Sequence, residues 1–134
     1  MTSGEHVKIA REAWKTYGER GLDAASEYFA EDCVLEDLPE LPDRATYHGR
    51  EGVRERARHF EEVWGDFAME PVEFIDAGDG VVVAVVVLSG RGKGSGAPLD
   101  APAAFVYEVR SGKIVRDRPF TSRSQALETA GRAE

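Results

Sequence analysis

The stretch from Tyr28 to Val53, YFAEDCVLEDLPELPDRATYHGREGV, decides the fold. In order, it predicts the end of a helix, a short strand over Cys33–Leu38, a proline-containing loop and the start of another helix. On the strand, Leu35 and Asp37 lie two residues apart and share one face, whereas Glu36 points to the other face. A carboxylate is therefore expected on the inward face of a small fold.

The bulk composition limits the class of protein. The chain has 134 residues, of which 42% are hydrophobic, and this fits one domain over residues 1–134. A formal net charge of −8 argues against nucleic acid or an anionic membrane as the partner. Cys33 is the only cysteine, which excludes an intrachain disulfide and fits a reducing cytoplasm. The longest apolar run, Val81–Leu88, is too short to span a membrane, and the N-terminus lacks an apolar signal core.

Hydrophobic periodicity predicts helices first and strands afterwards. A spacing of three and four residues indicates amphipathic helices over residues 4–18, 23–30 and 49–64. From Met69 the period falls to two, and turns separate strands over residues 69–77, 81–88, 101–110 and 113–120, before a short helix over 122–130. This order predicts an α+β fold in which a curved antiparallel sheet wraps around the N-terminal helices, with a pocket between them. The glycine-rich run SGRGKGSG lacks the spacing of a phosphate loop and is expected to connect two strands.

The order and spacing of these segments resemble a known family. FAEDCVLED after a helix, YHGREGV at the start of the next helix, RSGKIV between the last strands and SQALETAG at the end resemble the SnoaL-like branch of the nuclear transport factor 2-like superfamily. The resemblance covers almost the whole chain and implies a cone-shaped, cystatin-like α+β barrel, usually a homodimer through the sheet. Both faces of one strand are apolar (Val82, Val83, Val85, Val86 and Val87), so we expect a homodimer through the outer face of the sheet. The superfamily includes polyketide cyclases, ketosteroid isomerase, limonene epoxide hydrolase, dehydratases and non-catalytic binders, so the fold alone does not give the function.

Asp37 is the first catalytic candidate. FAEDCVLED resembles the segment of ketosteroid isomerase that ends in its general base, and Asp37 falls on that base. The other groups of that isomerase match less well, because its first-helix tyrosine is replaced by Trp14 or displaced to Tyr17, and its second acid falls at Phe105 or a neighbour. The last-strand acid of the epoxide hydrolase falls on Pro119. Neither steroid-type isomerisation nor epoxide hydrolysis is therefore expected in its familiar form.

Asp117 and His48 are the other catalytic candidates. If Val115, Asp117 and Pro119 face the cone, Asp117 lines the pocket; alternatively, Asp117 forms an ion pair with an arginine on the sheet. His48 lies at the entrance to a helix, where it either acts as an acid or base or is a loop residue hydrogen-bonded to backbone. The aromatic residues expected to bind a ligand are Trp14, Tyr17, Phe60, Trp64, Phe105 and Tyr107. The histidines lack the short spacing of metal ligands, so a metal is not expected. No other cofactor is predicted.

Two functions remain open at this point. The first is a cofactor-independent isomerase or cyclase, in which Asp37 removes a proton beside the carbonyl of an apolar small molecule. The second is a non-catalytic ligand-binding or accessory module with the same fold. A pair of polar groups that converge in a sealed pocket would favour the enzyme, whereas a cone filled by side chains would favour the module.

Overall fold

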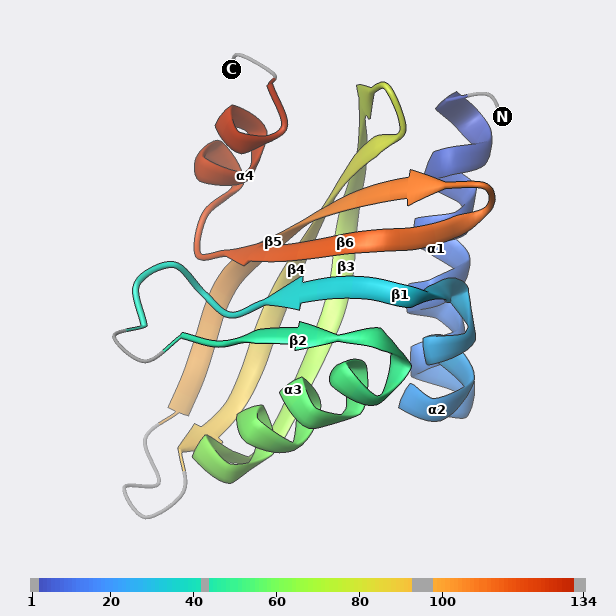
Figure 1. Ribbon diagram of the computed structural model, residues 1–134. Helices are drawn as coiled ribbons and strands as arrows, with labels where there is room; N and C mark the ends of the chain where they lie inside the picture. Colours follow the sequence, from blue (N-terminus) through green and yellow to red (C-terminus); the bar gives the residue numbers. More distant parts are fainter. Residues whose placement is uncertain (1–2, 42–43, 93–97, 132–134) are drawn as a thin grey trace.

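The helices and strands follow one another in the order that Figure 1 shows. The computed structural model describes residues 3–41, 44–92 and 98–131, and of residues 3, 63–67, 91–92 and 98–99 it describes the backbone alone. The elements are α1 (Ser3–Arg20), α2 (Leu22–Ala25), a 3-10 turn η1 (Ser26–Tyr28), β1 (Phe29–Glu36), β2 (Thr46–His48), α3 (Gly49–Val63), β3 (Trp64–Gly78), β4 (Val81–Gly92), β5 (Pro98–Arg110), β6 (Lys113–Phe120) and α4 (Arg123–Thr129). The glycine-rich connection from β4 to β5 includes residues 93–97, which lie outside this description.

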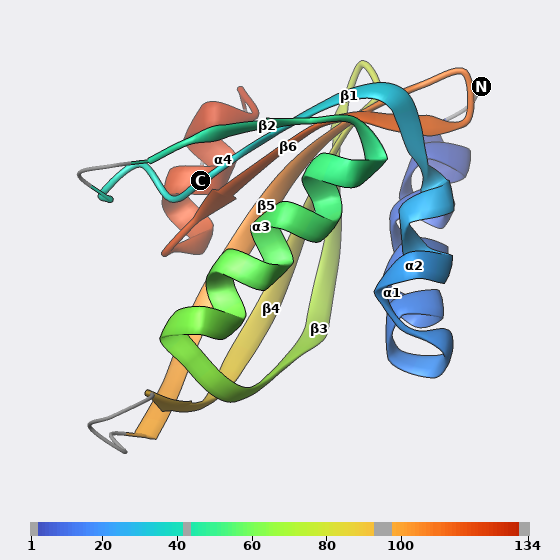
Figure 2. The same cartoon turned by 60° about the horizontal axis from the view of Figure 1, so that its bottom comes forward.

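The strands form one six-stranded sheet in the order β2-β1-β6-β5-β4-β3. Strands β1 and β6 run parallel, while the other neighbouring pairs are antiparallel, so the sheet is mainly antiparallel, as expected. The sheet curves around α1 and α3 without closing, because β2 and β3 remain as its two edges (Figure 2). The α+β fold with N-terminal helices inside a curved sheet is therefore confirmed, but the sheet is open and does not form a barrel.

Apolar side chains pack on both faces of the sheet. The inner face meets α1 and α3 in a core that includes Ala10, Trp14, Phe29, Leu35, Val53, Val82, Val86, Phe105, Tyr107 and Ile114. On the outer face, Ala126 and Leu127 of α4 pack with Val83, Val85, Ala104, Val106 and Phe120. Ser122 caps this helix, since its hydroxyl accepts a hydrogen bond from the backbone N–H of Gln125 at 3.2 Å.

Helix α4 covers part of the face for which we expected a second copy of the chain. Val83, Val85 and Val106 lie beneath it and are nearly inaccessible. Val87 lies on the same face by strand alternation and is 38% exposed. The homodimer through the outer face remains a prediction.

A bulge in β6 sets which residues face inward near the end of the chain. Glu108 of β5 is opposite Arg116, but the next residue, Val109, is opposite Ile114, so one extra residue is inserted in β6. The turn that precedes it has φ values of 50° at Ser111 and 79° at Gly112, as expected for a tight hairpin. Because of the bulge, Ile114 and Asp117 both face the inner core, which corrects the simple alternation that placed them on opposite faces.

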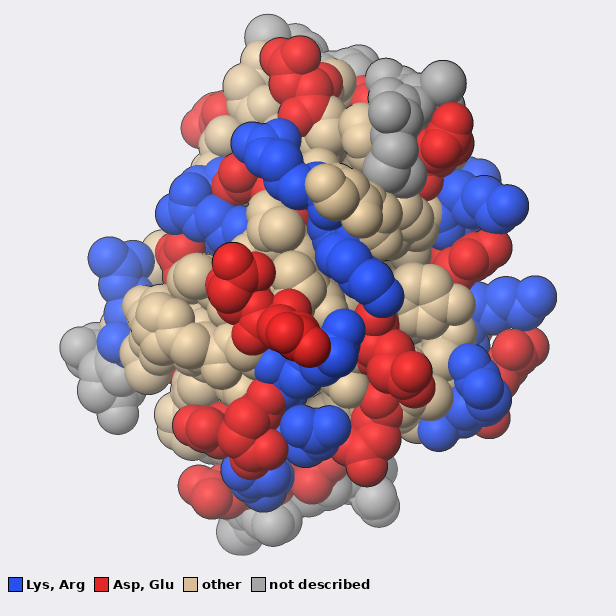
Figure 3. Space-filling view, turned by 45° about the vertical axis from the view of Figure 1, so that its right-hand side comes forward, with Lys and Arg blue, Asp and Glu red and all other residues tan. Residues whose placement is uncertain are grey.

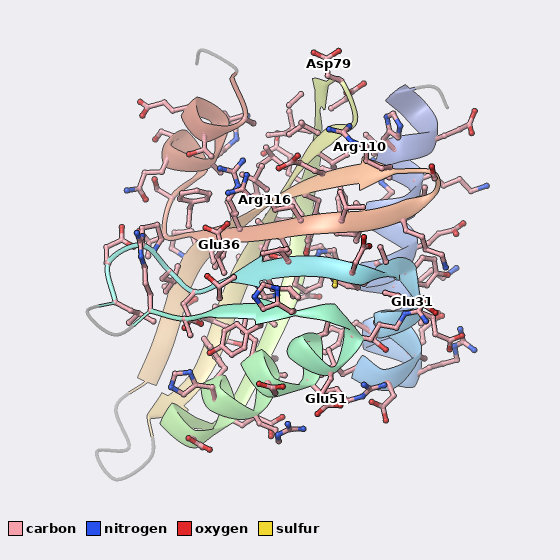
Figure 4. The ribbon with its side chains drawn as sticks, viewed as in Figure 1. Glu31, Glu36, Glu51, Asp79, Arg110 and Arg116 are labelled. Carbon is pink, nitrogen blue, oxygen red and sulfur yellow. The ribbon has the colours of Figure 1, made fainter. Side chains whose placement is uncertain are left out.

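Charged side chains of both signs are interspersed over the face in Figure 3, so this face carries no extended basic patch. Glu36 and Arg116, labelled in Figure 4, lie close together on neighbouring strands, and the Arg116 Nη2 group donates to Glu36 Oε2 at 2.9 Å. Leu35 is buried while Glu36 pairs with Arg116 on the outer face, as the alternation of β1 predicted. In the part of the chain that the structure describes, no helix is long and apolar enough to cross a membrane.

Candidate functional site

A pocket lies between the inner face of the sheet and helices α1 to α3. Its volume is about 80 Å³, which is small beside the ~300–1,000 Å³ of typical ligand pockets. It is open to solvent on one side, so a longer molecule can extend from it. The residues that line it are Ala13, Trp14, Tyr17, Leu22, Ala25, Phe29, Val53, Arg56, Met69, Phe105, Tyr107 and Asp117. The lining is mostly apolar and aromatic, with a few polar groups on one wall.

Arg56 and Asp117 form an ion pair in this lining. The Arg56 Nη2 group donates to Asp117 Oδ2 at 2.7 Å, and Nη1 donates to Oδ1 at 3.1 Å, so the contact has two points. The side chain of Asp117 is 1% exposed and that of Arg56 is 20% exposed. Burial alone would lower the pKa of Arg56, but the Asp117 carboxylate outweighs it, and the pKa lies above its usual value.

Further contacts fix the position of the Arg56 guanidinium. Its Nη1 group also donates to the backbone carbonyl of Glu36 at 3.2 Å, which ties α3 to β1. The guanidinium carbon lies 5.8 Å from the centre of the Phe105 ring, in the range of a cation–π contact. Arg56 is therefore a built part of the pocket wall and not a solvated side chain of α3.

Tyr107 presents its hydroxyl group beside this ion pair. The Tyr107 oxygen accepts a hydrogen bond from Trp14 Nε1 at 3.0 Å, and Tyr107 is directly opposite Asp117 in the register of β5 and β6. Burial raises the pKa of the Tyr107 hydroxyl well above its usual value, and the Asp117 carboxylate raises it further. Tyr107 therefore keeps its proton at neutral pH and can donate it in a hydrogen bond.

The aromatic rings hold one another in place around Tyr107. The rings of Trp14 and Phe105 lie 5.5 Å apart, and Phe105 stacks on Tyr107 at 6.1 Å. Tyr17 meets Trp14 edge to face at 5.8 Å. The expected ligand-binding residues Trp14, Tyr17, Phe105 and Tyr107 are thus brought together in one lining.

Asp37 lies outside the residues that line the pocket. Strand β1 ends at Glu36, and the chain then turns so that Asp37 Oδ2 accepts from the backbone N–H of Ala45 at 2.9 Å and from the Tyr47 hydroxyl at 3.2 Å. The Tyr47 oxygen also contacts His59 Nδ1 at 3.0 Å. Two hydrogen bonds therefore hold the Asp37 carboxylate against the following loop and β2, and Asp37 is not among the residues of the pocket lining. Its role as a base stays a prediction.

The remaining candidates fall in three different places. His48 is exposed at the end of β2, away from the pocket lining. Phe60 is half-buried on α3 and does not line the pocket. The side chain of Trp64 lies outside the described residues. Among the residues that are described, no group of three or more His, Cys, Asp or Glu side chains could hold a metal ion.

The sequence analysis did not propose several of the lining residues as part of a site, among them Arg56 and Met69. A signal for Arg56 was present, because it lies three residues after Val53 and therefore on the apolar stripe of α3. Because an arginine on an amphipathic helix is usually solvated, Arg56 was not proposed as a pocket residue. Asp117 was expected either to line the pocket or to form an ion pair with an arginine of the sheet. It does line the pocket, and its partner comes from α3.

Comparison with known proteins agrees with the fold. The family model for the SnoaL-like domain matches residues 10–117, and the chain belongs to this family. No curated protein matches the chain. A solved nuclear transport factor 2-like protein from Burkholderia thailandensis is 22% identical, with 96% of this chain and 98% of that chain covered and a TM-score of 0.78.

Two other solved structures carry more specific names. TerC, co-crystallised with polyporic acid, is 18% identical over 95% of this chain and 98% of its own, with a TM-score of 0.74. A protein from Sinorhizobium meliloti, provisionally assigned as a polyketide cyclase, is 21% identical over 89% of this chain and 99% of its own, with a TM-score of 0.66. At these identities the likeness establishes the fold alone.

Proposed function

We propose that the chain binds a small, largely apolar carbonyl compound in this pocket, with Tyr107 donating a hydrogen bond to the carbonyl oxygen. The hydrogen bond from Trp14 to Tyr107 carries the proposal. It occupies a lone pair of the Tyr107 oxygen and leaves the hydroxyl hydrogen for a second acceptor. A buried donor of this kind favours a ligand that brings its own acceptor, since an unpaired polar group is costly.

The apolar part of the lining supports the rest of the proposal. Aromatic and aliphatic side chains surround the polar wall, as in most small-molecule sites. The co-crystallisation of TerC with polyporic acid is an instance in which this fold accompanies an organic ligand. The open side of the pocket allows a ligand larger than the enclosed volume, with its carbonyl group innermost.

Catalysis is the second candidate, as a cofactor-independent isomerase or cyclase. Asp117 and Tyr107 lie opposite each other on adjacent strands, so a proton acceptor and a donor share one wall. Arg56 holds both oxygens of Asp117, so this carboxylate would have to leave the ion pair to take a proton from a ligand, and binding is the better supported function. For Asp37 to act as the base, its carboxylate would have to leave Ala45 and Tyr47 and turn toward the pocket.

Acetophenone is a suitable probe of binding, because it combines one ring with one carbonyl group. We expect NMR titration to show binding to the wild type and about three- to tenfold weaker binding to Tyr107→Phe, which loses the neutral hydrogen bond to the ligand. The variant also removes the acceptor of Trp14 Nε1. Tyr47→Phe is the matched control, since Tyr47 lies outside the pocket lining, and it should bind as the wild type does. Binding of equal strength to all three proteins would refute the role of Tyr107.

The same probe separates binding from catalysis. In D₂O, a base that removes protons next to the carbonyl exchanges the methyl protons of acetophenone for deuterium, and this is visible as loss of the methyl signal. Exchange faster than in buffer would support catalysis, and the variants Asp117→Asn, Asp37→Asn and His48→Gln would show which residue is responsible. If the methyl protons exchange only at the rate seen in buffer while acetophenone still binds, the result supports the non-catalytic binding module.

A further inference from the structure

The charged side chains in the pocket lining are one cation and one anion. Within the described part of the chain, Arg56 and Asp117 are the residues of the lining that carry charge at neutral pH. Their two-point contact means that each nearly cancels the charge of the other. The ligand therefore meets a neutral wall, although a guanidinium group lies in it.

The geometry also keeps Arg56 from turning toward an incoming anion. Asp117 occupies both terminal nitrogens, and Nη1 has the additional bond to the Glu36 carbonyl. A carboxylate ligand would have to break these contacts or lie unpaired beside Asp117. Either alternative costs free energy, because the Asp117 side chain has no access to water that could replace the lost partner.

Carboxylates around the pocket act in the same direction. Burial raises the pKa of the Tyr107 hydroxyl, and the negative charge of Asp117 raises it further. Burial likewise raises the pKa of the Tyr17 hydroxyl, and the negative charge of Glu61 adds to this effect. Asp37 adds to the negative potential at Arg56. Negative charge is therefore disfavoured at both tyrosine hydroxyls of the lining.

We infer that the Arg56–Asp117 pair selects neutral carbonyl compounds and rejects carboxylates of the same shape. Arg56 is in this view the specificity-determining residue, and Asp117 is the positioning residue that cancels its charge. The inference rests on the proposed function, because it concerns the same pocket and the same ligand. It narrows the ligand class from apolar carbonyl compounds in general to uncharged ones.

Acetophenone and benzoate test this inference, since they differ mainly by a methyl group in place of a charged oxygen. Near neutral pH we expect NMR titration of the wild type to give a dissociation constant for benzoate at least about tenfold larger than for acetophenone. Asp117→Asn keeps the shape of the side chain and leaves the charge of Arg56 uncancelled. In this variant the preference should shrink by about tenfold or reverse in favour of benzoate.

Glu36→Gln is the matched control. It removes the same unit of negative charge from the neighbouring strand, but on the outer face, where Glu36 pairs with Arg116. Its ligand preference should equal that of the wild type. Circular dichroism shows whether each variant is folded, and the comparison of the two ligands on the wild type needs no variant.

The outcomes separate this inference from the function on which it rests. If neither compound binds the wild type, the proposed function fails and the inference fails with it. If acetophenone binds and benzoate binds equally well, the function stands and the inference is overturned. An unchanged preference in folded Asp117→Asn would likewise overturn it, because the charge of Arg56 would then not govern selection.

Discussion

Removing one partner of the Arg56–Asp117 pair is expected to destabilise the protein more than removing both. Arg56→Met leaves the Asp117 carboxylate, which is 1% exposed, without its cation. Breaking a buried ion pair in this way costs about 3–5 kcal/mol of unfolding free energy. Asp117→Leu leaves the Arg56 guanidinium unpaired and should cost somewhat less, because that side chain is 20% exposed.

The double variant, Arg56→Met with Asp117→Leu, replaces both charges by apolar groups. Such replacements are often neutral or stabilising by about 1–4 kcal/mol, so the two single costs should not add. Urea denaturation followed by tryptophan fluorescence measures each free energy. For a slope of about 2 kcal/mol per molar urea, the Arg56→Met midpoint should fall by roughly 1.5–2.5 M.

A surface ion pair provides the control for this cycle. Arg54 Nε and Asp23 Oδ1 lie 2.8 Å apart, but both side chains are exposed. The same cycle at Arg54 and Asp23 should leave the urea midpoint nearly unchanged, because solvent screens exposed pairs. Single costs below about 1 kcal/mol at Arg56 and Asp117, or costs that add in the double variant, would refute the account of a buried, coupled pair.

Three further predictions concern the fold around the site. Gly49→Ala should lower the free energy of unfolding by at least about 1 kcal/mol, because φ is 71° and a Cβ atom would lie 2.9 Å from the Glu31 carbonyl oxygen. Gly18→Ala, where α1 leaves open space for a Cβ atom, should instead raise it by up to about 1 kcal/mol. Urea titration measures both changes. Cys33 is fully buried and burial raises the pKa of its thiol, so its alkylation by iodoacetamide should be as slow as unfolding, and rapid alkylation of folded protein would contradict this. Burial raises the folded-state pKa of Tyr107 above its unfolded value near 10, so unfolding free energy should fall as pH rises above ~10, and Tyr107→Phe should reduce that slope.

The sequence predicted the fold well, because its signals are local and periodic. The three-and-four spacing of α1 and α3, the alternation of Leu35 and Glu36, and the turn at Ser111 and Gly112 each depend on neighbouring residues. The order of these segments then sufficed for the resemblance to the SnoaL-like family, which the family model confirms.

The candidate site was only partly predictable, because it depends on long-range contacts. The resemblance gave Asp37, but the chain turns where β1 ends, and hydrogen bonds to Ala45 and Tyr47 decide where the carboxylate lies. Arg56 and Asp117 are far apart in the sequence and meet only when α3 packs against the sheet. The pairing of these two residues is therefore not recognisable from local pattern, although Arg56 lies on the apolar stripe of α3 and Asp117 was a candidate for the pocket.

The placement of two other features also depends on long-range packing. The inward positions of Ile114 and Asp117 depend on a bulge in β6 that strict alternation does not foresee. The terminal helix α4 was predicted as a helix, but its position over Val83 and Val106 was not. Both features are set by how distant segments pack.

The central claim is that Tyr107 donates a hydrogen bond to the carbonyl oxygen of a ligand in the pocket. Acetophenone labelled with ¹³C at its carbonyl carbon tests it most directly, since hydrogen bonding to the oxygen moves that resonance downfield. With enough protein to saturate the probe, the bound resonance should lie further downfield in the wild type than in Tyr107→Phe. The same bound resonance in the two proteins, or no bound signal in the wild type, would contradict the claim.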